Sequence, residues 1–332
     1  MKIFEMSRED RKLRKHFEER AKRELRLAKK FRSKFGGEPR SRSRASSAGM
    51  AVETGPGFCD VLSGGQRVRC RSAGDATIGD RVLFSVDRRR IEEVLPRRTT
   101  LSRADPQNPH RERVIAANID LVVHVVSLKS PPLRPGLIDR YLIATAAAGA
   151  APLVCVNKID LLEAASELEP LQTYEALGVP VLRCSAASGQ GIHQLREALA
   201  AKLCVFTGHS GVGKSSLLNA LDPDLELATN TVNAASEKGR HTTTSSALYQ
   251  LANGGMVIDT PGIREFGLWK IRAADVRRYF HEFSSHQCAF SDCSHIHEPD
   301  CAVRAAADSG AIAPARYESY RRIVATLDTG PS

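Results

Sequence analysis

Hydrophobic and polar positions divide the chain into regions of different periodicity, and the first regular region has a β pattern. From about Met50 to Arg113, the short runs "CDVL", "QRVRC", "DRVLFSV" and "RIEEVL" alternate with Gly and Asp turns. Runs of this length and spacing predict a small all-β barrel. An OB-type barrel fits and is a common platform for nucleic acids, although the pattern alone does not separate it from an SH3-like barrel.

Farther along, buried-strand runs alternate with helical runs, and no internal repeat is visible. The strand runs are short and mostly apolar, whereas the runs between them have helical spacing. The expected strands are 120–127, 152–157, 180–186, 203–208 and 256–260, and the expected helices are "GLIDRYLIATAAAG", "IHQLREALAAK" and "KSSLLNAL". This alternation predicts an α/β domain with a mostly parallel, doubly wound sheet.

Both ends of the chain have a helical pattern. Apolar residues recur every three or four positions between Ser7 and Phe35 on an otherwise basic segment, and a Gly-Gly pair ends the pattern. The C-terminal segment is helical around a Cys/His loop. The expected domains are a basic arm and linker at 1–49, an OB-fold barrel at 50–113, an α/β domain at 114–271 and a helical domain around the Cys/His loop at 272–332.

The excess positive charge is concentrated in the arm. Residues 1–48 hold 17 Lys and Arg against 7 Asp and Glu, an excess equal to the net charge of +10 of the whole chain. A basic arm on a neutral body indicates a polyanionic partner, most simply a nucleic acid, with a solvated tail as the alternative. Because no apolar run is long enough for a bilayer and no secretory signal is present, we expect a cytoplasmic monomer without a membrane partner.

The motif "GHSGVGKS" matches the phosphate-binding loop G-x-x-x-x-G-K-[ST]. Its glycines let backbone N–H groups surround phosphate oxygens, Lys214 can reach the β- and γ-phosphates, and Ser215 can offer its hydroxyl to Mg²⁺. A strand run enters the motif and a helix leaves it, so that the helix N-terminus favours an anion. The expected phosphate-binding residues are Gly208, His209, Ser210, Gly211, Val212, Gly213, Lys214, Ser215 and Ser216.

The motif "NKID" has the composition of a guanine-recognition loop. The carboxylate of Asp160 can accept two hydrogen bonds from the guanine edge, whereas adenine presents the wrong pattern. Asn157 is expected to bind the other edge of the base and to bridge to the phosphate loop, with the stem of Lys158 on the ring. In "CSAASGQG", the backbone of Ser185 and Ala186 is expected to contact the guanine carbonyl.

The motif "DTPG" supplies the parts that sense the γ-phosphate. Asp259 is expected to hold Mg²⁺, and the N–H of Gly262 to face the γ-phosphate. Every part of a GTPase site is therefore present, but base recognition precedes the phosphate loop instead of following it. A sheet tolerates this circular permutation when the original termini lie close together.

The segment between the phosphate loop and "DTPG" has the composition of a mobile switch loop. Its "HTTT" motif offers Thr242 or Thr243 to complete the magnesium shell, so the expected magnesium ligands are Ser215, Thr242, Thr243 and Asp259. Ile263 stands near the position where many GTPases place a water-orienting Gln, and slow intrinsic hydrolysis is therefore expected. His241 is the nearest polar candidate for that role, with a surface histidine as the alternative.

Near the C-terminus, "CAFSDCSHIHEPDC" gathers Cys288, Cys293, His295, His297 and Cys301 in one loop. Three thiolates and one imidazole make a closed tetrahedral zinc site of the structural kind, and either histidine can be the fourth ligand. Several arginines surround the loop and could face RNA or form a solvated helix surface: Arg277, Arg278, Arg304, Arg316, Arg321 and Arg322.

The order of barrel, permuted GTPase and Cys/His loop resembles the RsgA family (also YjeQ or YloQ) of circularly permuted ribosome-biogenesis GTPases. The resemblance runs from about residue 50 to the C-terminus and includes "AANID", "IDRYL", "SGVGKSSLLNAL", "GRHTTT", "IDTPGIREFGL" and "HEPDCAV". It implies an enzyme that hydrolyses GTP to GDP and phosphate with Mg²⁺. It also implies binding to the small ribosomal subunit late in maturation, stimulation by that subunit, and release on hydrolysis.

The resemblance also implies roles for particular residues. The OB barrel and zinc domain of the family contact ribosomal RNA, and hydrolysis is attributed to the switch histidine, here His241. The zinc ligands of the family map onto Cys288, Cys293, His295 and Cys301. The chain departs from the family in three ways: His209 replaces a usual Gln, the segment after Cys70 matches only in part, and the basic arm is not a general family feature.

Two other functions are consistent with the sequence. One is an RNA-binding assembly factor whose nucleotide site is only structural, and the other is a permuted GTPase that acts on the large ribosomal subunit. GTP turnover with and without small subunits separates the first from the leading hypothesis, and co-sedimentation with subunits separates the second.

Overall fold

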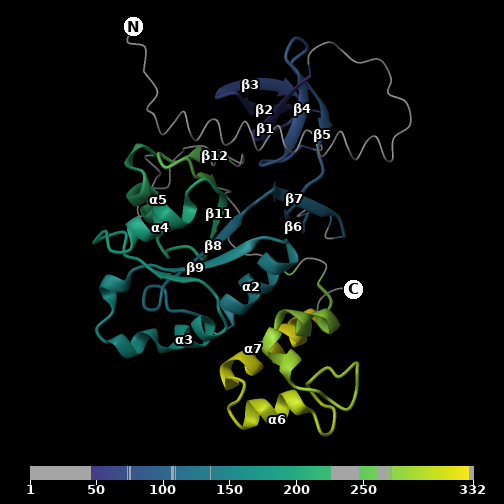
Figure 1. Cartoon of the computed structure of the whole chain (residues 1–332), viewed down its shortest axis with the longest axis vertical. Coiled ribbons are helices and arrows are strands. Elements are labelled where there is room, and N and C mark those ends of the chain that lie inside the picture. Colours follow the sequence, from purple (N-terminus) through teal and green to yellow (C-terminus); the bar gives the residue numbers. More distant parts are fainter. Residues whose placement is uncertain are drawn as a thin grey trace.

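The computed structural model describes residues 46–72, 74, 76–105, 108, 110–134, 136–225, 247–259, 268 and 271–328. These residues form a β-barrel, a central sheet with helices, and a C-terminal helical region, which follow one another along the long axis of the molecule (Figure 1). The helix expected within 7–35, and nearly all of the expected arm at 1–49, lie outside the described residues.

Five strands close the N-terminal barrel. The strands are β1 (Ser46–Gly55), β2 (Phe58–Ser63), β3 (Gln66–Arg71), β4 (Arg81–Ser85) and β5 (Arg90–Val94). β1 pairs with both β2 and β4, β2 with β3, and β5 with both β3 and β4, so the circuit of strands is complete. Small and β-branched side chains such as Ala51, Val61 and Val82 fill its interior around Phe84. The predicted OB-type barrel is confirmed.

A hairpin that the hydrophobic pattern did not predict connects the barrel to the central sheet. Its strands are β6 (Thr100–Ala104) and β7 (Glu112–Ala117). β7 also approaches the barrel, since a bridge pairs Ile78 with Ala116. Gly79 makes this approach possible, because a Cβ atom there would lie 2.0 Å from the carbonyl oxygen of Ala117, and its φ of +85° favours glycine.

The central sheet contains the strands predicted from the α/β pattern. They are β8 (Leu121–Val126), β9 (Ala151–Val156), β10 (Val181–Arg183), β11 (Leu203–Thr207) and β13 (Met256–Asp259), joined by β12 (Ala247–Gln250), which was not predicted. The spatial order is β10-β9-β8-β11-β13-β12, with β12 antiparallel to its neighbour and the others parallel. One register pair, Glu53 with Ala247, joins the sheet to the barrel.

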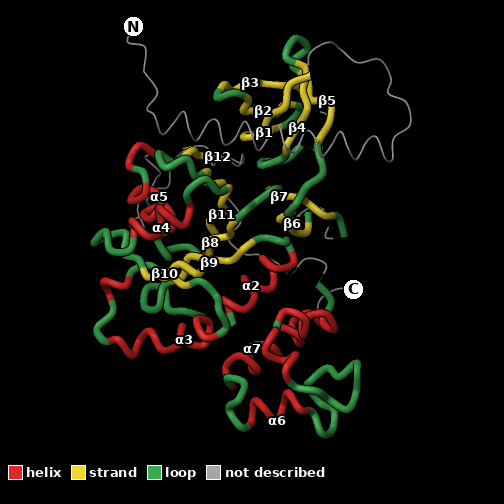
Figure 2. The backbone as a smooth tube through the Cα atoms, in the orientation of Figure 1, coloured by secondary structure: helices red, strands yellow, loops and turns green. Residues whose placement is uncertain are grey.

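Helices cover both faces of the sheet, as the doubly wound prediction required. The helices are α2 (Leu137–Ala147), α3 (Glu169–Ala176), α4 (Ile192–Leu199) and α5 (Lys214–Leu221), with short 3₁₀ turns η1 (Ile159–Leu161), η2 (Ala165–Leu168) and η3 (Pro223–Leu225). Figure 2 shows α4 and α5 on one side of the strands and α2 and α3 on the other. Alternate residues of β8 serve the two cores: Val123 and Val125 pack with α4 and α5, and Val122 and Val126 with α2.

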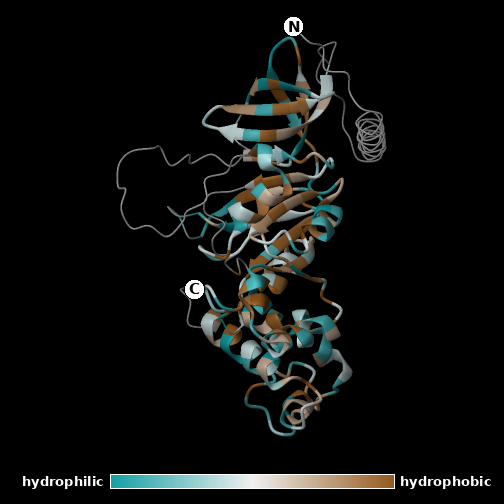
Figure 3. Ribbon diagram, turned by 90° about the vertical axis from the view of Figure 1, so that its left-hand side faces the viewer, coloured by the Kyte–Doolittle hydropathy of each residue, from teal (hydrophilic) through white to brown (hydrophobic). Residues whose placement is uncertain are grey.

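The C-terminal region is helical around the Cys/His loop, as expected, but two of its four helical segments are 3₁₀. The segments are η4 (Ala273–Tyr279), η5 (His281–Ser285), α6 (Ala302–Asp308) and α7 (Pro314–Asp328). Phe280, Val303 and Tyr320 belong to the same apolar cluster as Tyr141 of α2. The hydrophobic residues of Figure 3 therefore continue from the central strands into this region. No helix among the described residues is long and apolar enough to cross a membrane.

Candidate functional site

The phosphate loop leaves the carboxyl end of β11, the strand that lies between β8 and β13. Ligands of parallel α/β sheets bind at this edge. Gly208 has φ +143°, and a Cβ atom there would lie 2.2 Å from the carbonyl oxygen of Val125. Gly213 has φ +92° and is the N-cap of α5. Gly208 and Gly213 therefore have backbone conformations that favour glycine, and α5 begins directly after Gly213.

The phosphate loop has its own internal contacts. The ammonium of Lys214 donates to the carbonyl oxygens of Gly208 at 2.6 Å and His209 at 3.0 Å. These bonds hold the amine over the loop, at the place where a nucleotide phosphate is expected. Ser215 and Ser216 follow in the first turn of α5, where backbone N–H groups have no helical acceptor.

Asn157 joins the base-recognition loop to the phosphate loop. Its side chain is 2% exposed, its Nδ2 donates to the carbonyl oxygen of Val212 at 2.8 Å, and its Oδ1 accepts from the backbone N–H of Ala186 at 3.1 Å. Three segments far apart in the sequence therefore meet at one amide. The expected bridge to the phosphate loop is present, and it runs through Val212.

Asp160 and Lys158 flank this amide. Asp160 is exposed in the 3₁₀ turn η1, and its Oδ1 accepts from the hydroxyl of Ser185, a fully buried residue. Lys158 has a left-handed backbone with φ +64° and donates from Nζ to the carbonyl oxygen of Ser130 at 2.7 Å. The structure thus brings together Asn157, Lys158, Asp160, Ser185 and Ala186 beside the phosphate loop.

A further ion cluster, which no sequence motif indicated, consists of Lys129, Glu163 and Glu167, and we name it the Lys129 clasp. The Lys129 ammonium lies 2.8 Å from Glu163 and 3.2 Å from Glu167. Glu167 in turn accepts from the backbone N–H groups of Glu163 and Ala164, at 2.7 and 3.0 Å. The bond to Glu163 raises the pKa of Lys129. The clasp ties the loop after β8 to the chain that follows the base-recognition motif.

Several expected site residues lie outside the described residues. They are His241, Thr242, Thr243, Ile263 and Gly262. Asp259 is the last residue of β13, directly beside the P-loop strand β11, which is where its motif was expected. The described part of the site therefore comprises the base loop, the phosphate loop and the strand that leads to the switch.

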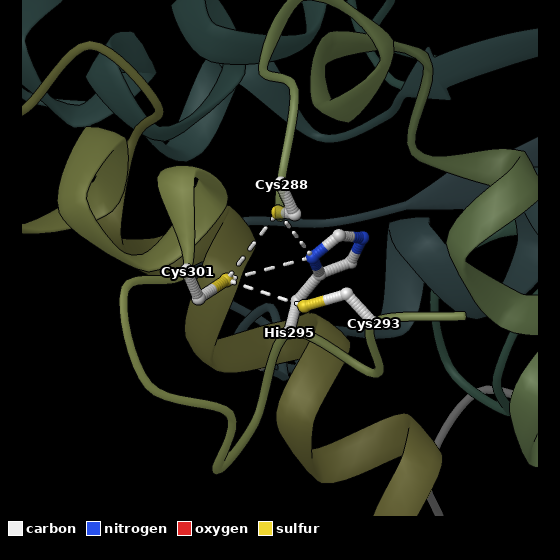
Figure 4. A group of neighbouring side chains, drawn as sticks. All are labelled: Cys288, Cys293, His295 and Cys301. Carbon is white, nitrogen blue, oxygen red and sulfur yellow. Dashed lines mark hydrogen bonds between the residues drawn. The ribbon is translucent and has the colours of Figure 1, made fainter. Parts of the chain in front are cut away.

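The four residues of the Cys/His cluster converge from three sides of the C-terminal region (Figure 4). Their ligand atoms all lie within 4.8 Å of one another. Sγ of Cys301 lies 3.8 Å from Sγ of both Cys288 and Cys293, and Nδ1 of His295 lies 3.5 Å from Sγ of Cys288 and Cys301. A tetrahedral zinc ion with its usual bond lengths sets edges of about 3.8 Å between sulfurs and about 3.5 Å between sulfur and nitrogen. The donor set therefore fits zinc.

The structure selects one of the two candidate histidines. His295 is 8% exposed and belongs to the cluster, whereas His297 is exposed and does not. Burial lowers the pKa of His295, which favours the neutral ring that a metal requires.

The loop that presents His295 is fixed by groups that the sequence did not single out. Glu298 accepts from the backbone N–H groups of Ser294 at 2.7 Å and Ile296 at 3.2 Å. The hydroxyl of Tyr317 donates to the carbonyl oxygen of His295 at 2.6 Å, and Tyr320 donates to that of Ser294. These bonds stabilise the left-handed backbone of His295, whose φ is +61°.

Electrostatic conditions differ between the thiols. Desolvation raises the pKa of Cys293 to about 12. Desolvation acts in the same direction on Cys288, but hydrogen bonds from the backbone of Val303 and Ala302 and from the thiols of Cys293 and Cys301 together outweigh it and lower the pKa. Binding of a metal cation would stabilise all three thiolates and release their protons.

One expectation about the surrounding arginines was wrong. Arg316 neither faces a partner nor lies on a solvated surface, because it is 5% exposed. It forms ion pairs with Asp139 of α2 and, at 2.8 Å, with Glu282 of η5, and its guanidinium lies 4.3 Å from the ring centroid of Phe280. Since a charge is buried only with partners, the residue belongs to the contact between the C-terminal region and the central domain.

The barrel, the order of strands and the loops that meet at Asn157 define a circularly permuted P-loop GTPase with an OB-type barrel in front and a Cys₃His cluster behind. The family model described as RsgA GTPase matches residues 94–269. The chain belongs to the RsgA GTPase family and is a GTP hydrolase.

Individual relatives agree with this assignment. The "Small ribosomal subunit biogenesis GTPase RsgA" of Chlorobaculum parvum is 43% identical over 88% of this chain and 93% of the relative, and that of Dickeya dadantii is 41% identical over 79% of each. The crystal structure of YjeQ from Thermotoga maritima has a TM-score of 0.71 at 31% identity, and covers 86% of this chain and 100% of its own. The structure of YloQ, a circularly permuted GTPase, has a TM-score of 0.67 at 26% identity, with 89% and 100% covered.

Proposed function

We propose that the chain is a ribosome-biogenesis GTPase that binds the small ribosomal subunit late in its maturation, is stimulated by it and leaves it on hydrolysis. Relatives about 40% identical carry the small subunit in their names, and the described residues include the base-recognition and phosphate loops that such an enzyme uses. The observation that carries the GTPase part is the amide of Asn157, which holds base loop and phosphate loop together.

The residues divide into three groups by the part of the nucleotide they face. Asp160 recognises the guanine edge once its bond to Ser185 opens, and the stem of Lys158 covers the ring. The backbone N–H groups of 208–216 donate hydrogen bonds to the phosphates. The ammonium of Lys214 leaves the carbonyl oxygens of Gly208 and His209 and neutralises phosphate charge. The hydrogen bonds seen within the loops are thus exchanged for bonds to the nucleotide, which reduces the cost of leaving buried groups unpaired.

Two metal ions complete the proposal. Ser215 and Asp259, with Thr242 or Thr243, would hold Mg²⁺, which supplies charge for the phosphates. Cys288, Cys293, His295 and Cys301 would hold a structural Zn²⁺, because their spacing matches a tetrahedral donor set. His241 is the proposed group that orients the attacking water, since Ile263 has no polar atom to do so.

The proposed partner is a particle rather than a small molecule. The net charge of +10, all of it from the arm, favours a polyanion such as ribosomal RNA. We place this activity in the cytoplasm and propose a monomer, with functional units at 1–49, 50–113, 114–271 and 272–332.

The test measures GTP turnover by the full chain alone and with purified small or large subunits, and co-sedimentation with each subunit in GDP or a non-hydrolysable GTP analogue. We expect stimulation by small subunits only, and co-sedimentation that is stronger with the analogue than with GDP. Equal turnover in all three samples would contradict the proposal and favour a structural nucleotide site. Preference for the large subunit would contradict its choice of particle.

A further inference from the structure

A cavity of about 410 Å³ opens in the C-terminal region between the 3₁₀ segments and the Cys/His loop. Its walls come from Arg277 and Arg278 of η4, His281 of η5, and His286 and Phe290 of the loop. The volume lies in the range of sites that hold small ligands. The nucleotide site described above lies in the central domain, so this cavity is a separate feature.

The lining carries positive charge and no carboxylate. Arg277 is fixed in the wall, because its guanidinium donates to the carbonyl oxygens of Cys293 at 2.8 Å and Ser291 at 3.3 Å. Arg278 pairs with Asp275 at 3.2 Å but keeps 73% of its side chain exposed, so that it can turn toward a ligand. Such a wall favours an anion.

The same lining presents aromatic surface. Phe290 is 48% exposed, one of four large hydrophobic residues that are exposed in the described part of the chain. Phe280 and Phe283 are buried at the inner wall, where their rings pack in a tilted arrangement with centroids 5.2 Å apart. An exposed ring is stabilised when a flat apolar partner covers it, and a ring beside guanidinium groups is the combination that binds unpaired bases and their phosphates.

The metal cluster supports the wall that carries this ring. Cys288 and Cys293 bracket Phe290, the backbone N–H of Cys293 donates to the carbonyl oxygen of Phe290 at 3.3 Å, and Cys288 and His295 line the cavity. The loop is therefore fixed at both ends, close to the exposed ring. A fixed ring loses little conformational entropy on binding, which favours its use as a stacking platform.

We propose that this cavity binds one unpaired nucleotide of an RNA, with its base stacked on Phe290 and its phosphate held by Arg278. The inference rests on the proposed function only in taking its RNA partner from there. A double helix does not fit, because its bases are stacked inside and cannot reach the ring. An acidic peptide would use the arginines but would gain little from the phenyl ring.

The test uses the full chain and a single-stranded RNA octamer that carries one 2-aminopurine, whose emission falls when its base stacks. We expect the wild type to quench the emission on binding. Phe290→Ala should weaken binding by about fivefold to a hundredfold and abolish the quenching, as loss of one base–aromatic stack predicts. Phe290→Trp should retain both, and Arg278→Ala should weaken binding.

Arg272→Ala is the matched control for Arg278→Ala. Arg272 also pairs with Asp275, at 2.7 Å, and is 78% exposed, but it does not line the cavity. Its substitution should leave binding within twofold of the wild type. Zinc content and GTP turnover of each variant establish that the fold is intact.

Three results would overturn the inference: no quenching by the wild type, unchanged binding and quenching in Phe290→Ala, or sensitivity to Arg278→Ala alone, which would indicate an anion or acidic-peptide site. Co-sedimentation with small subunits is measured on the same preparations. If the wild type co-sediments and any of the three results is obtained, the cavity inference fails while the proposed function stands. If the wild type does not co-sediment but stacking is seen, the proposed function fails while the cavity inference stands.

Discussion

At the scale of single residues, the proposed nucleotide site includes two side chains that already have partners. The Asn157 amide donates one hydrogen bond to the carbonyl oxygen of Val212 and accepts one from the N–H of Ala186, and Asp160 accepts from Ser185. The close fit extends to Gly213, where a Cβ atom would lie 2.3 Å from Nδ2 of Asn157. The pocket is thus assembled by the protein itself, with the carboxylate of Asp160 left accessible to a base.

Asp160→Asn should change which base is accepted. An amide cannot accept both guanine donors, and the loss of two hydrogen bonds to a charged group costs about 3 kcal/mol or more, a hundredfold or greater loss in GTP affinity. Xanthosine triphosphate should bind better than before. Competition binding with GTP, ATP and xanthosine triphosphate measures this, with Asp224→Asn, an exposed acid of η3, as control. An unchanged order of affinities would refute the guanine pocket.

Lys129→Ala should loosen the base loop without touching the reacting phosphate. Its two ion pairs are partly exposed, so we expect the KM for GTP to rise about threefold to tenfold, with kcat within about twofold. Lys202→Ala provides the control, since Lys202 is exposed and its ammonium donates to the backbone carbonyl oxygen of Ala198. A fall in kcat with an unchanged KM would show that the Lys129 clasp acts elsewhere.

At the scale of elements, the hydrophobic pattern predicted the barrel strands and the parallel strands because continuous apolar runs are local in sequence. It missed β12 and the hairpin of β6 and β7, which are short and mixed in polarity and are defined by pairing with distant partners. The candidate site shows the same difference between features that are local in sequence and contacts between distant residues. The motifs located the loops, but the Lys129 clasp and the hydrogen bonds that Glu298 accepts from Ser294 and Ile296 join groups whose contacts depend on the folded backbone.

The Cys/His loop leads to a prediction about metal. The full chain should contain one zinc ion, Cys293→Ser should lose most of it, and His297→Ala should retain it, because His297 is exposed and outside the cluster. Since the thiols bind metal as thiolates, lowering the pH should release zinc. Metal analysis and a colorimetric zinc indicator measure both effects. Loss of zinc in His297→Ala with retention in His295→Ala would reverse the ligand assignment.

At the scale of the whole molecule, the C-terminal region and the central domain share one apolar cluster and one buried ion group. The sequence predicted a helical region around a structural metal site. It did not predict the contact between the two regions, because local patterns carry no information about contacts between distant segments. Arg316 illustrates this limit: its position in a basic helix indicated an exposed residue, but it pairs with Asp139, 177 positions away.

Arg316→Met should strip Asp139 and Glu282 of their shared partner. Removal of one member of a buried ion pair typically costs about 3–5 kcal/mol, so the free energy of unfolding should fall by that order. The control is Arg322→Met on the same helix, where a pair with Glu318 at 60% exposure should contribute less than about 1 kcal/mol. Denaturant unfolding of both variants measures the difference. Equal stability would mean that the apolar cluster alone joins the regions.

The segment that leads into α2 contacts both the base-recognition loop and α7. The carbonyl oxygen of Ser130 accepts a hydrogen bond from the ammonium of Lys158. Gly136 is the N-cap of α2, and α7 packs closely against it, since a Cβ on Gly136 would lie 2.8 Å from the hydroxyl of Ser319. A displacement of α7 would therefore bear on a segment that contacts the base-recognition loop at Ser130 and also lies beside the phosphate loop, since a Cβ on Gly211 would lie 3.7 Å from Cδ of Pro131. The residence time of bound GDP is the quantity that would report such a displacement.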